Sequence, residues 1–271
     1  MKFSILIAHY NNWLYLQDCL KSIENQTYKN YEIIIVDDCS TDDSFEFLRA
    51  ISTKNSNIKL FQNECNKKVG FTKKRCVDEA SGDVCIFVDP DDMITSTTLE
   101  EILNIYIESD QYIATYSKIK LIDENKSILG DFKHSKKITN NKSNFFNINF
   151  EVAHLFSFKR ESYLQTSGID GSLSSAVDQD LYLKLYEVGD FYFINKFQYY
   201  YRIHDKGVSQ NVSRKKELYI NWHKVLTETC KRRNIKEIYG KQIAEVDDLP
   251  TFIYTNENNL LKRLFNKISI A

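Results

Sequence analysis

Proline, glycine and long apolar runs are scarce in this chain. Its 271 residues include two prolines and eight glycines, and they show neither a Pro-rich linker nor an internal repeat. No apolar run approaches the roughly 20 residues that span a bilayer. The opening stretch MKFSILIAHYNN turns polar too early for a signal peptide. This length therefore suits one large domain, or a domain with an extension.

An excess of charge of either sign is also missing. The chain has 36 lysines and arginines against 37 aspartates and glutamates, which leaves a net charge of −1. No strong field therefore attracts nucleic acid or an anionic membrane, and we expect no nucleic-acid partner.

The cysteines form no C-x-x-C pair, which argues against a zinc ribbon or a redox motif. Several of them lie in apolar segments, as small buried hydrophobic residues do. The six are Cys19, Cys39, Cys65, Cys76, Cys85 and Cys230. This usage is typical of a reducing compartment, so we expect a cytoplasmic protein.

The first half of the chain alternates strand and helix patterns. Buried strands are predicted at 2–8, 31–38, 57–62 and 83–89, and helices at 12–26, 40–51, 70–82 and 96–109. Near-continuous apolar strands separated by helices indicate a parallel sheet covered on both faces. In such sheets, ligands bind beyond the carboxyl ends of the strands.

The inward faces of the first helices follow from apolar residues spaced three and four apart. They consist of Leu16, Cys19, Leu20 and Ile23 in the first helix, and of Phe47, Leu48 and Ile51 in the second. Gly82 is expected to end the third helix.

Beyond residue 110 the pattern weakens. We predict a strand at 111–123, a polar, mobile loop at 131–147, a helix at 181–189 with Leu181 and Leu185 inward, a strand at 191–204, and helices at 213–234 and 258–270. The last helix has an apolar stripe of Leu260, Leu261, Leu264, Phe265 and Ile268. We expect this stripe to dock on the protein's own core or on another subunit. A membrane-surface helix is the alternative.

Carboxylates cluster where the fourth strand ends, in IFVDPDDMI. Asp89, Asp91 and Asp92 form a D-x-D element with one extra acid. Two unpaired carboxylates ~4 Å apart repel by ~4 kcal/mol at an effective dielectric near 20, so a cation is expected among them. Mg²⁺ and Mn²⁺ prefer such oxygen ligands and share them with phosphates. A simple turn, with Asp92 or Ser96 starting the next helix, is the alternative.

A second acidic pair, Asp37 and Asp38, ends the second strand. In a parallel sheet both acidic clusters lie at one edge. Ser40, Thr41 and Asp42 make a good helix start, which does not require the preceding pair. A carboxylate there can accept the N–H of a uracil base, and Tyr10 offers a ring face for stacking, although it also suits the core.

Two stretches further along add polar groups. Asp178 and Asp180 begin a helix and, being two apart, do not share its face. One can therefore face a cleft as a general base while the other caps the helix or faces solvent. Arg202 and His204 lie on the same face of a strand, where they suit a pyrophosphate or a metal. A capping aspartate and a surface histidine are the alternatives.

In order, the stretches SILIAHYNN, EIIIVDDCSTDDS, GFTKKRCVDEASGD, IFVDPDDMI, AVDQDLYLKL and YRIHDKGVS resemble glycosyltransferase family 2 over roughly residues 2–210. The resemblance implies a nucleotide-sugar-dependent inverting enzyme. It also implies an α/β GT-A fold, with a Rossmann-like, mostly parallel central sheet and helices on both faces. Residues 1–210 would be the catalytic domain, and residues 211–271 a C-terminal helical extension.

The resemblance also assigns nucleotide contacts. Ala8 and Tyr10 would line the base pocket, and Asp38 would hold uracil if the donor is a uridine nucleotide. Arg75 would approach the nucleotide. Asp89 would contact the ribose or the metal shell.

The remaining implied roles concern the sugar, the metal and the base. Asp91 would be the main ligand of Mn²⁺ or Mg²⁺, with His204 reaching the metal or the pyrophosphate. Arg202 would contact phosphate, and Asp92 would lie near the donor sugar. Asp178 would be the catalytic base.

Three positions depart from the family pattern. Val177 replaces the glutamate expected before the base, Cys76 replaces the asparagine after the helix arginine, and Pro90 replaces a small residue in the metal motif. Because of Val177, a second function stays open, namely that of an inactive family member that binds glycan or acts as an assembly subunit. A nucleotidyltransferase is disfavoured, because AHYNNWLYL contains no Gly-rich, basic phosphate loop.

The expected reaction moves a hexose from a nucleotide diphosphate sugar, of the UDP-glucose or UDP-galactose type, to a hydroxyl group. The acceptor would be a glycan, a glycolipid or a glycoprotein, in the synthesis of surface polysaccharide or glycoprotein glycans. The C-terminal helices could mediate formation of a homo-oligomer, or a peripheral contact with the inner face of a membrane.

Overall fold

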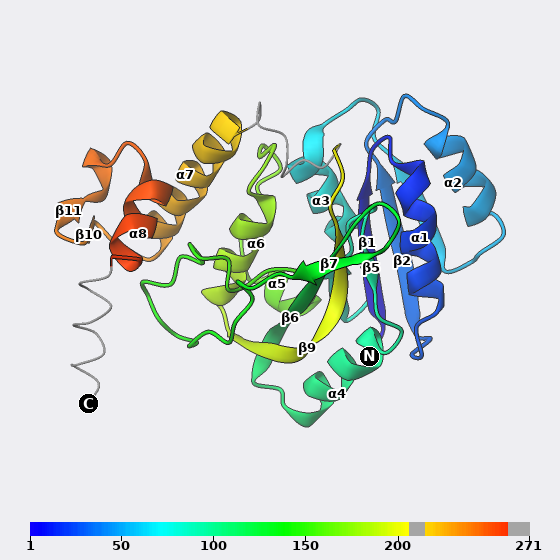
Figure 1. The fold of residues 1–271 in the computed structure, drawn as a ribbon, viewed down its shortest axis with the longest axis horizontal. Coiled ribbons are helices and arrows are strands. Elements are labelled where there is room, and N and C mark those ends of the chain that lie inside the picture. Colours follow the sequence, from blue (N-terminus) through cyan, green and yellow to red (C-terminus); the bar gives the residue numbers. More distant parts are fainter. Residues whose placement is uncertain (206–214, 260–271) are drawn as a thin grey trace.

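A computed structural model describes residues 1–205 and 215–259. Figure 1 shows one central sheet with helices packed around it. Its strands are β1 (Phe3–His9), β2 (Tyr31–Asp37), β3 (Ile58–Gln62), β4 (Val84–Phe87), β5 (Met93–Ile94), β6 (Tyr112–Ile122), β7 (Ile128–Asp131), β8 (Phe156–Lys159) and β9 (Asp190–Arg202). A small hairpin, β10 (Glu237–Ile238) and β11 (Lys241–Gln242), lies apart from it.

The sheet is mostly parallel, as predicted. Its strand order is β3-β2-β1-β4-β8-β6-β9-β5, with β7 paired to β6. β1 pairs in parallel with both β2 and β4, β2 with β3, and β6 with β9. The exceptions are β8, β7 and β5, which run antiparallel to their neighbours.

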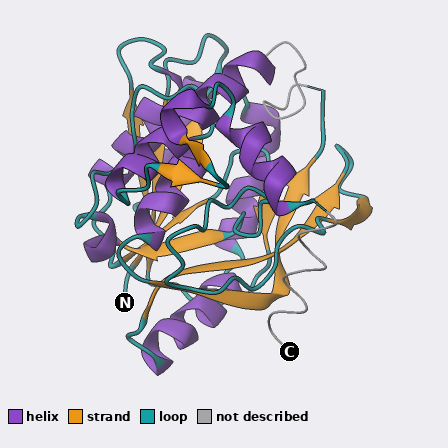
Figure 2. Cartoon of the chain, turned by 90° about the vertical axis from the view of Figure 1, so that its left-hand side faces the viewer, coloured by secondary structure: helices purple, strands orange, loops and turns teal. Residues whose placement is uncertain are grey.

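Helices cover the sheet on both faces (Figure 2). They are α1 (Trp13–Glu24), α2 (Ser44–Ser52), α3 (Lys68–Asp78), α4 (Thr98–Glu108), α5 (Arg160–Tyr163), α6 (Val177–Tyr186), α7 (Lys215–Arg232), α8 (Leu249–Glu257) and the 3-10 helix η3 (Ile243–Glu245). Alternate residues of β1 separate the two layers, since Ile5 and Ile7 join one apolar cluster and Leu6 the other. The predicted α/β architecture, a mostly parallel sheet with helices on both faces, is therefore confirmed.

The predicted inward face of the first helix is also confirmed, because all four of its residues are buried. The second helix begins later than predicted, at Ser44, and Phe47 is 44% exposed, against the expectation that it faces inward. Its ring stacks instead on Trp13, with ring centroids 5.0 Å apart.

Gly82 does not end the third helix, which stops at Asp78. A Cβ atom at this position would lie 2.7 Å from the carbonyl oxygen of Lys2 and from the hydroxyl of Ser4. The glycine is therefore required by close packing against β1, which sequence spacing does not reveal.

The second half departs further from the prediction. The helix with Leu181 and Leu185 inward is confirmed as α6, although it begins at Val177. The loop predicted at 131–147 ends in the core, because Phe146 and Asn147 are each 1% exposed. The short strand β8 was not predicted, although Phe156 and Phe158 are buried at the centre of the sheet.

The C-terminal helices pack onto the sheet domain. Trp222, Leu226 and Ile253 belong to the same apolar cluster as Leu6 of β1. The predicted boundary at residue 210 and the apolar stripe at 260–268 lie outside the described residues. Within 1–205 and 215–259, no helix combines the length and the apolar character that crossing a membrane requires.

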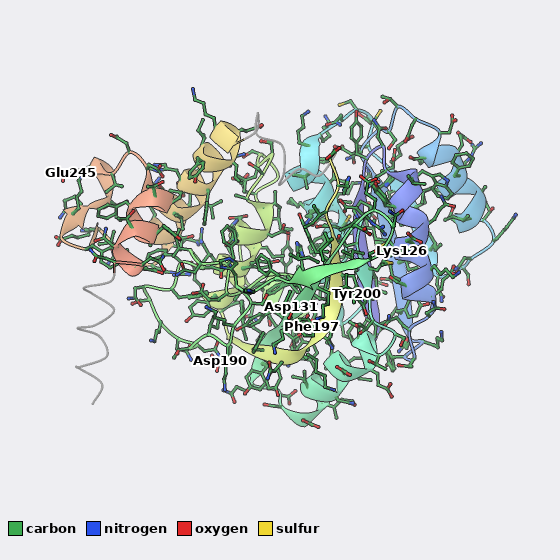
Figure 3. The ribbon with its side chains drawn as sticks, in the orientation of Figure 1. Lys126, Asp131, Asp190, Phe197, Tyr200 and Glu245 are labelled. Atoms are coloured by element: carbon green, nitrogen blue, oxygen red, sulfur yellow. The ribbon has the colours of Figure 1, made fainter. Side chains whose placement is uncertain are left out.

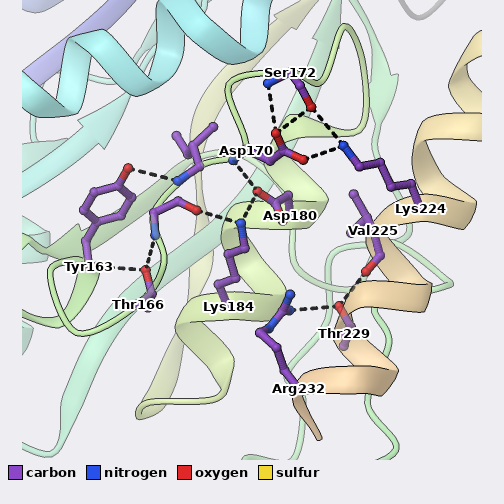
Figure 4. A network of polar contacts seen from close by, with 12 residues as sticks. Tyr163, Thr166, Asp170, Ser172, Asp180, Lys184, Lys224, Val225, Thr229 and Arg232 are labelled. Carbon is purple, nitrogen blue, oxygen red and sulfur yellow. Dashed lines mark hydrogen bonds and ion pairs between the residues drawn. The ribbon is translucent and has the colours of Figure 1, made fainter.

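A buried ion pair fixes α6 against its surroundings (Figure 4). The Asp180 carboxylate accepts hydrogen bonds from the Lys184 ammonium at 2.8 Å and from the Asp170 backbone N–H at 2.8 Å. Lys184 also donates to the Gly168 carbonyl at 2.6 Å. Asp170 in turn binds Lys224 of α7 at 2.7 Å, so the C-terminal extension holds the loop before α6.

We predict that Lys184→Met lowers the free energy of unfolding by about 3–5 kcal/mol, because it leaves the Asp180 carboxylate buried without its cation. Urea unfolding measures this loss. The matched control is Lys231→Met, which removes an exposed pair with Glu228 and should cost about 0–1 kcal/mol. Equal losses in the two variants would contradict the prediction.

Candidate active site

The carboxyl ends of β1, β2 and β4 meet at one edge of the sheet. His9 pairs with Asp37 across β1 and β2, and Leu6 pairs with Phe87 across β1 and β4. The acidic stretches that follow β2 and β4 therefore extend from the same edge. The parallel arrangement thus brings the two predicted acidic clusters to one side of the molecule.

Asp38 is 4% exposed and is held by three donors. Its Oδ1 accepts from Asn63 Nδ2 at 2.7 Å and from the Lys67 N–H at 2.8 Å, and its Oδ2 accepts from the Lys68 N–H at 2.9 Å. Arg75 donates to Asn63 Oδ1 at 2.8 Å. Arg75 therefore supports the residue that orients Asp38, and direct nucleotide contacts of both side chains stay a prediction.

The end of β1 is tied to the loop after β2. Asn11 Oδ1 accepts the Thr41 N–H at 2.7 Å, and Asn11 Nδ2 donates to the Thr41 hydroxyl at 3.0 Å. Ala8 is partly buried and Tyr10 is 43% exposed. The exposed ring fits a stacking surface better than the core position that the sequence left open.

A buried lysine joins two of the predicted site carboxylates. Lys73 of α3 is 4% exposed. Its ammonium lies 2.8 Å from Asp178 Oδ1 and 3.1 Å from Asp89 Oδ1. Burial opposes the charge on Lys73, but the two carboxylates outweigh this effect and raise its pKa. α3 thereby brings the end of β4 and the start of α6 into one cluster.

Asp89 is bound on its other side by a histidine. His154 Nε2 lies 3.5 Å from Asp89 Oδ2, and the His154 ring stacks on Tyr199 with centroids 5.1 Å apart. Burial would raise the pKa of Asp89, but Lys73 and His154 together lower it. The carboxylate is thus held ionised at the edge of the sheet.

Asp178 keeps one oxygen available. The Lys73 contact occupies Oδ1, and Oδ2 has no hydrogen-bond partner among the described residues. The side chain is 33% exposed. Neither Asp178 nor Asp180 caps the helix, whose N-cap is Ala176. The prediction that the second aspartate caps the helix or faces solvent is wrong, because Asp180 is buried against Lys184.

The metal motif meets the end of β9. His204 Nε2 lies 2.9 Å from Asp91 Oδ2, so the two predicted metal ligands are adjacent. The Tyr15 ring packs against His204, with centroids 4.7 Å apart, and against the Arg202 guanidinium at 4.7 Å. The strand predicted at 191–204 ends at Arg202, so His204 lies just beyond it, although both residues contact the same Tyr15 ring.

Arg202 is 1% exposed, and its donors are occupied by protein. Nε donates to the Asp91 carbonyl at 2.8 Å, Nη1 to the Glu124 carbonyl at 2.9 Å, and Nη2 to Asp18 Oδ2 at 3.1 Å. Its backbone N–H donates to Asp92 Oδ1 at 2.7 Å. In this arrangement Arg202 positions the metal motif, and its contact with phosphate stays a prediction.

Asp91 and His204 together offer two adjacent ligands to a divalent ion. No group of three or more histidine, cysteine, aspartate or glutamate side chains is arranged to hold a metal within the described parts of the chain. Asp92 Oδ2 and His204 Nδ1 are buried without hydrogen-bond partners among the residues of 1–205 and 215–259, and burial, Asp91 and Asp89 raise the pKa of Asp92. Asp91 and His204 therefore fit an ion that takes its remaining ligands from phosphate and water.

The three departures from the family pattern have separate consequences. Val177 is 3% exposed in the apolar core, so this position offers no polar group to a ligand. Cys76 is buried, and its thiol contacts the Ile7 carbonyl at 3.5 Å. Pro90 lies in the turn that the Asp92 N–H closes onto the Asp89 carbonyl at 3.1 Å.

Lys73, His154 and Tyr15 were not predicted from the sequence. For Lys73 a signal was present, since it falls on the buried stripe of α3 between Gly70 and Val77. A lysine on an apolar stripe needs a buried anionic partner. His154 follows a loop and carries no comparable pattern.

Comparison with known proteins agrees with this geometry. The sequence model of Glycosyl transferase family 2 matches residues 4–165. The chondroitin synthase of Escherichia coli is 28% identical over 259 residues, which cover 95% of this chain and 37% of that protein. The GalNAc(5)-diNAcBac-PP-undecaprenol beta-1,3-glucosyltransferase of Campylobacter jejuni is 27% identical over 282 residues, covering 99% of this chain and 89% of that protein.

A solved structure shows the same fold. The crystal structure of S. aureus TarS 1-349 in complex with UDP-GlcNAc aligns with a TM-score of 0.69 and 24% identity, over 85% of this chain and 66% of that chain. The family match covers more than half of the sequence. The chain belongs to glycosyltransferase family 2, and it has the GT-A fold. It spans 37% and 25% of the chondroitin synthases of E. coli and Pasteurella multocida.

We predict that Lys73→Met lowers the free energy of unfolding by about 2–3 kcal/mol, because it leaves Asp89 and Asp178 facing each other without a cation. This value is below that of a fully buried pair, since both carboxylates are partly exposed. The control is Lys74→Met on the exposed face of α3, expected within about 0.5 kcal/mol of the wild type. Chemical denaturation measures the free energy of unfolding of both variants. A Lys73→Met variant as stable as the control would contradict the role of Lys73 between Asp89 and Asp178.

Proposed function

We propose that this protein is an inverting glycosyltransferase that moves a hexose from a nucleotide diphosphate sugar to a hydroxyl group of a glycan. Membership of the family and the Asp178 carboxylate support this proposal. Asp178 is joined through Lys73 to the acidic end of β4, and it keeps Oδ2 available. A fixed carboxylate with one available oxygen suits a general base beside a donor site.

The base acts on the acceptor. Asp178 Oδ2 takes the proton of the acceptor hydroxyl as that oxygen attacks the anomeric carbon, from the face opposite the leaving nucleoside diphosphate. The configuration at that carbon inverts, so an α-linked donor gives a β-linked product. Lys73 orients the carboxylate through its contact with Oδ1, which makes it a positioning residue.

The donor is proposed to be a uridine nucleotide carrying a glucose-type or galactose-type sugar. Asp38, oriented by Asn63, and the exposed Tyr10 ring would receive the base, and Asp92 would lie near the sugar. The S. aureus TarS crystal structures contain UDP or UDP-GlcNAc, which supports a uridine donor for this related fold. Asp89 and Arg75 would complete the nucleotide site.

A divalent ion is part of the proposal. Asp91 and His204 would hold Mn²⁺ or Mg²⁺ next to the donor diphosphate. The ion would neutralise charge on the leaving group. Arg202 keeps this motif in place through its contacts with Asp91 and Asp92.

The acceptor is proposed to be a growing surface glycan, a glycolipid or a glycoprotein glycan. The names of the C. jejuni and E. coli relatives, an undecaprenol-linked glycan glucosyltransferase and a chondroitin synthase, support a glycan acceptor. An inactive, glycan-binding relative is the second candidate, favoured by Val177. Slow hydrolysis of the donor without acceptor separates the two, since a binding module shows none.

We predict that Asp178→Asn lowers the turnover rate about 10²–10⁴-fold, the usual contribution of a general base. Binding of UDP-glucose or UDP-galactose, measured by thermal shift with Mn²⁺, should stay near the wild-type value, because asparagine retains a contact for Lys73. The control is Asp247→Asn at an exposed position, with unchanged turnover. Normal turnover in Asp178→Asn would place the base elsewhere.

We predict that a chelator abolishes glycosyl transfer and that Asp91→Ala reproduces this loss in the presence of Mn²⁺. Both changes remove the charge compensation of the leaving diphosphate. Transfer assays with EDTA, followed by addition of excess Mn²⁺, measure the effect and its reversal. Full activity in EDTA would reject the metal role, while the Asp178 prediction would be unaffected.

A further inference from the structure

A cavity of about 320 Å³ lies outside the donor and base region. It is formed where the loop before β8 meets the β10–β11 hairpin and the end of α8. The lining residues are Lys142, Asn144, Phe145, Phe146, Asn147, Ile148, Asn149, Glu151, Tyr239, Asn256 and Glu257. None of these residues has a role in the proposed donor site.

The cavity has fixed walls. Asn147, which is 1% exposed, accepts the Val152 N–H and donates to the Val152 carbonyl, each at 2.8 Å. On the opposite side, Asn149 donates to Glu257 at 3.1 Å, and Asn258 donates to Asn149 at 2.8 Å. These bonds join the loop to α8, so protein contacts hold the two sides of the cavity together.

One aromatic wall is held in a costly conformation. Tyr239 and Gly240 connect β10 and β11 with φ values of 52° and 78°, as in the tight turns that join two antiparallel strands. A left-handed backbone is uncommon for a tyrosine, and here the two-residue turn requires it. The Tyr239 ring packs on Phe252, with centroids 6.2 Å apart.

Two carboxylates in the cavity, Glu151 and Glu257, form no ion pair with a cation in the described parts of the chain. Burial, followed by repulsion from Glu151, raises the pKa of Glu257 to about 7. In the described residues, no ion pair involves either glutamate. Lys142 also borders the cavity but is exposed. An anionic ligand would be repelled here, whereas hydroxyl groups would find acceptors in the carboxylates and a partner in the amide of Asn144.

The floor of the cavity contacts the helix that carries the proposed base. Asn147 Nδ2 donates to Gln179 Oε1 at 2.9 Å, and Gln179 follows Asp178 directly in α6. Both residues of this contact are buried. A ligand in the cavity would therefore lie behind the first turn of α6.

We infer that this cavity binds a neutral, hydroxyl-rich saccharide unit of the acceptor glycan, away from the hydroxyl group that reacts. Tyr239 and Phe145 would pack against the sugar ring, and Glu151 and Asn144 would meet its hydroxyl groups. The acceptor role rests on the proposed function, but the binding of a saccharide does not.

The test compares two oligosaccharides that share N-acetylglucosamine and differ in charge. N-acetylchitotetraose is neutral, and a hyaluronan tetrasaccharide carries uronate groups. Saturation-transfer NMR titrations of the full chain should show binding of the neutral probe and weaker binding of the anionic one. No binding of the neutral probe, or tighter binding of hyaluronan, would overturn the inference.

Variants place the binding in the cavity. Glu151→Ala should lower the affinity for the neutral oligosaccharide by about tenfold or more. The variant should fold, because the substitution removes a repulsion with Glu257. Tyr239→Ala should have a similar effect. The control is Glu245→Ala on η3, labelled in Figure 3, whose exposed side chain does not line the cavity. Wild-type affinity in Glu151→Ala and Tyr239→Ala would place the saccharide elsewhere.

Donor hydrolysis separates this inference from the proposed function. Glu151→Ala should hydrolyse UDP-glucose or UDP-galactose at the wild-type rate, because the cavity shares no residue with the donor site. If the protein binds the saccharide but does not hydrolyse any donor, the proposed transferase activity is rejected and saccharide binding in the cavity is kept. If the protein hydrolyses the donor but does not bind the saccharide, the inference about the cavity is rejected and the proposed activity is kept.

Discussion

The Lys73 ammonium is the contact on which the candidate site depends. It lies between Asp89 at the end of β4 and Asp178 at the start of α6, two segments that would otherwise repel each other. A lysine buried in this way is stable only because both carboxylates compensate its charge. The same contact occupies Oδ1 of Asp178, whose Oδ2 has no partner in the parts of the chain that the structure describes. Electrostatic compensation of the acidic edge thus also orients the proposed base.

Two supports keep this centre rigid. On one side, the buried Asp180–Lys184 pair and the Asp170–Lys224 bridge attach α6 to the C-terminal extension. On the other side, Arg202 fixes the backbone and side chain of the acidic turn through several hydrogen bonds. Catalytic groups need such support because small errors in position are costly to a reaction rate. The extension is therefore part of the architecture of the site.

Sequence patterns located the parallel half of the sheet well and the antiparallel half poorly. Long apolar strands separated by periodic helices have few alternative arrangements. By contrast, β8 is only four residues long, and its central place arises from pairing with β4 and β6. Gly82 and Phe47 were misassigned because their environments come from other segments. Asp180 was predicted to cap the helix or face solvent, whereas it is buried in an ion pair with Lys184, one turn later in α6.

The sequence by itself determined the family, the order of the acidic stretches and the edge at which they gather, because strand direction fixes where the ends of parallel strands lie. Only the tertiary structure decided which groups neutralise them. Lys73, His154 and the occupied donors of Arg202 are set by distances between segments far apart in the chain. Periodicity records which way a side chain faces on its own helix or strand, but it contains no information about the charge that another segment brings to meet it.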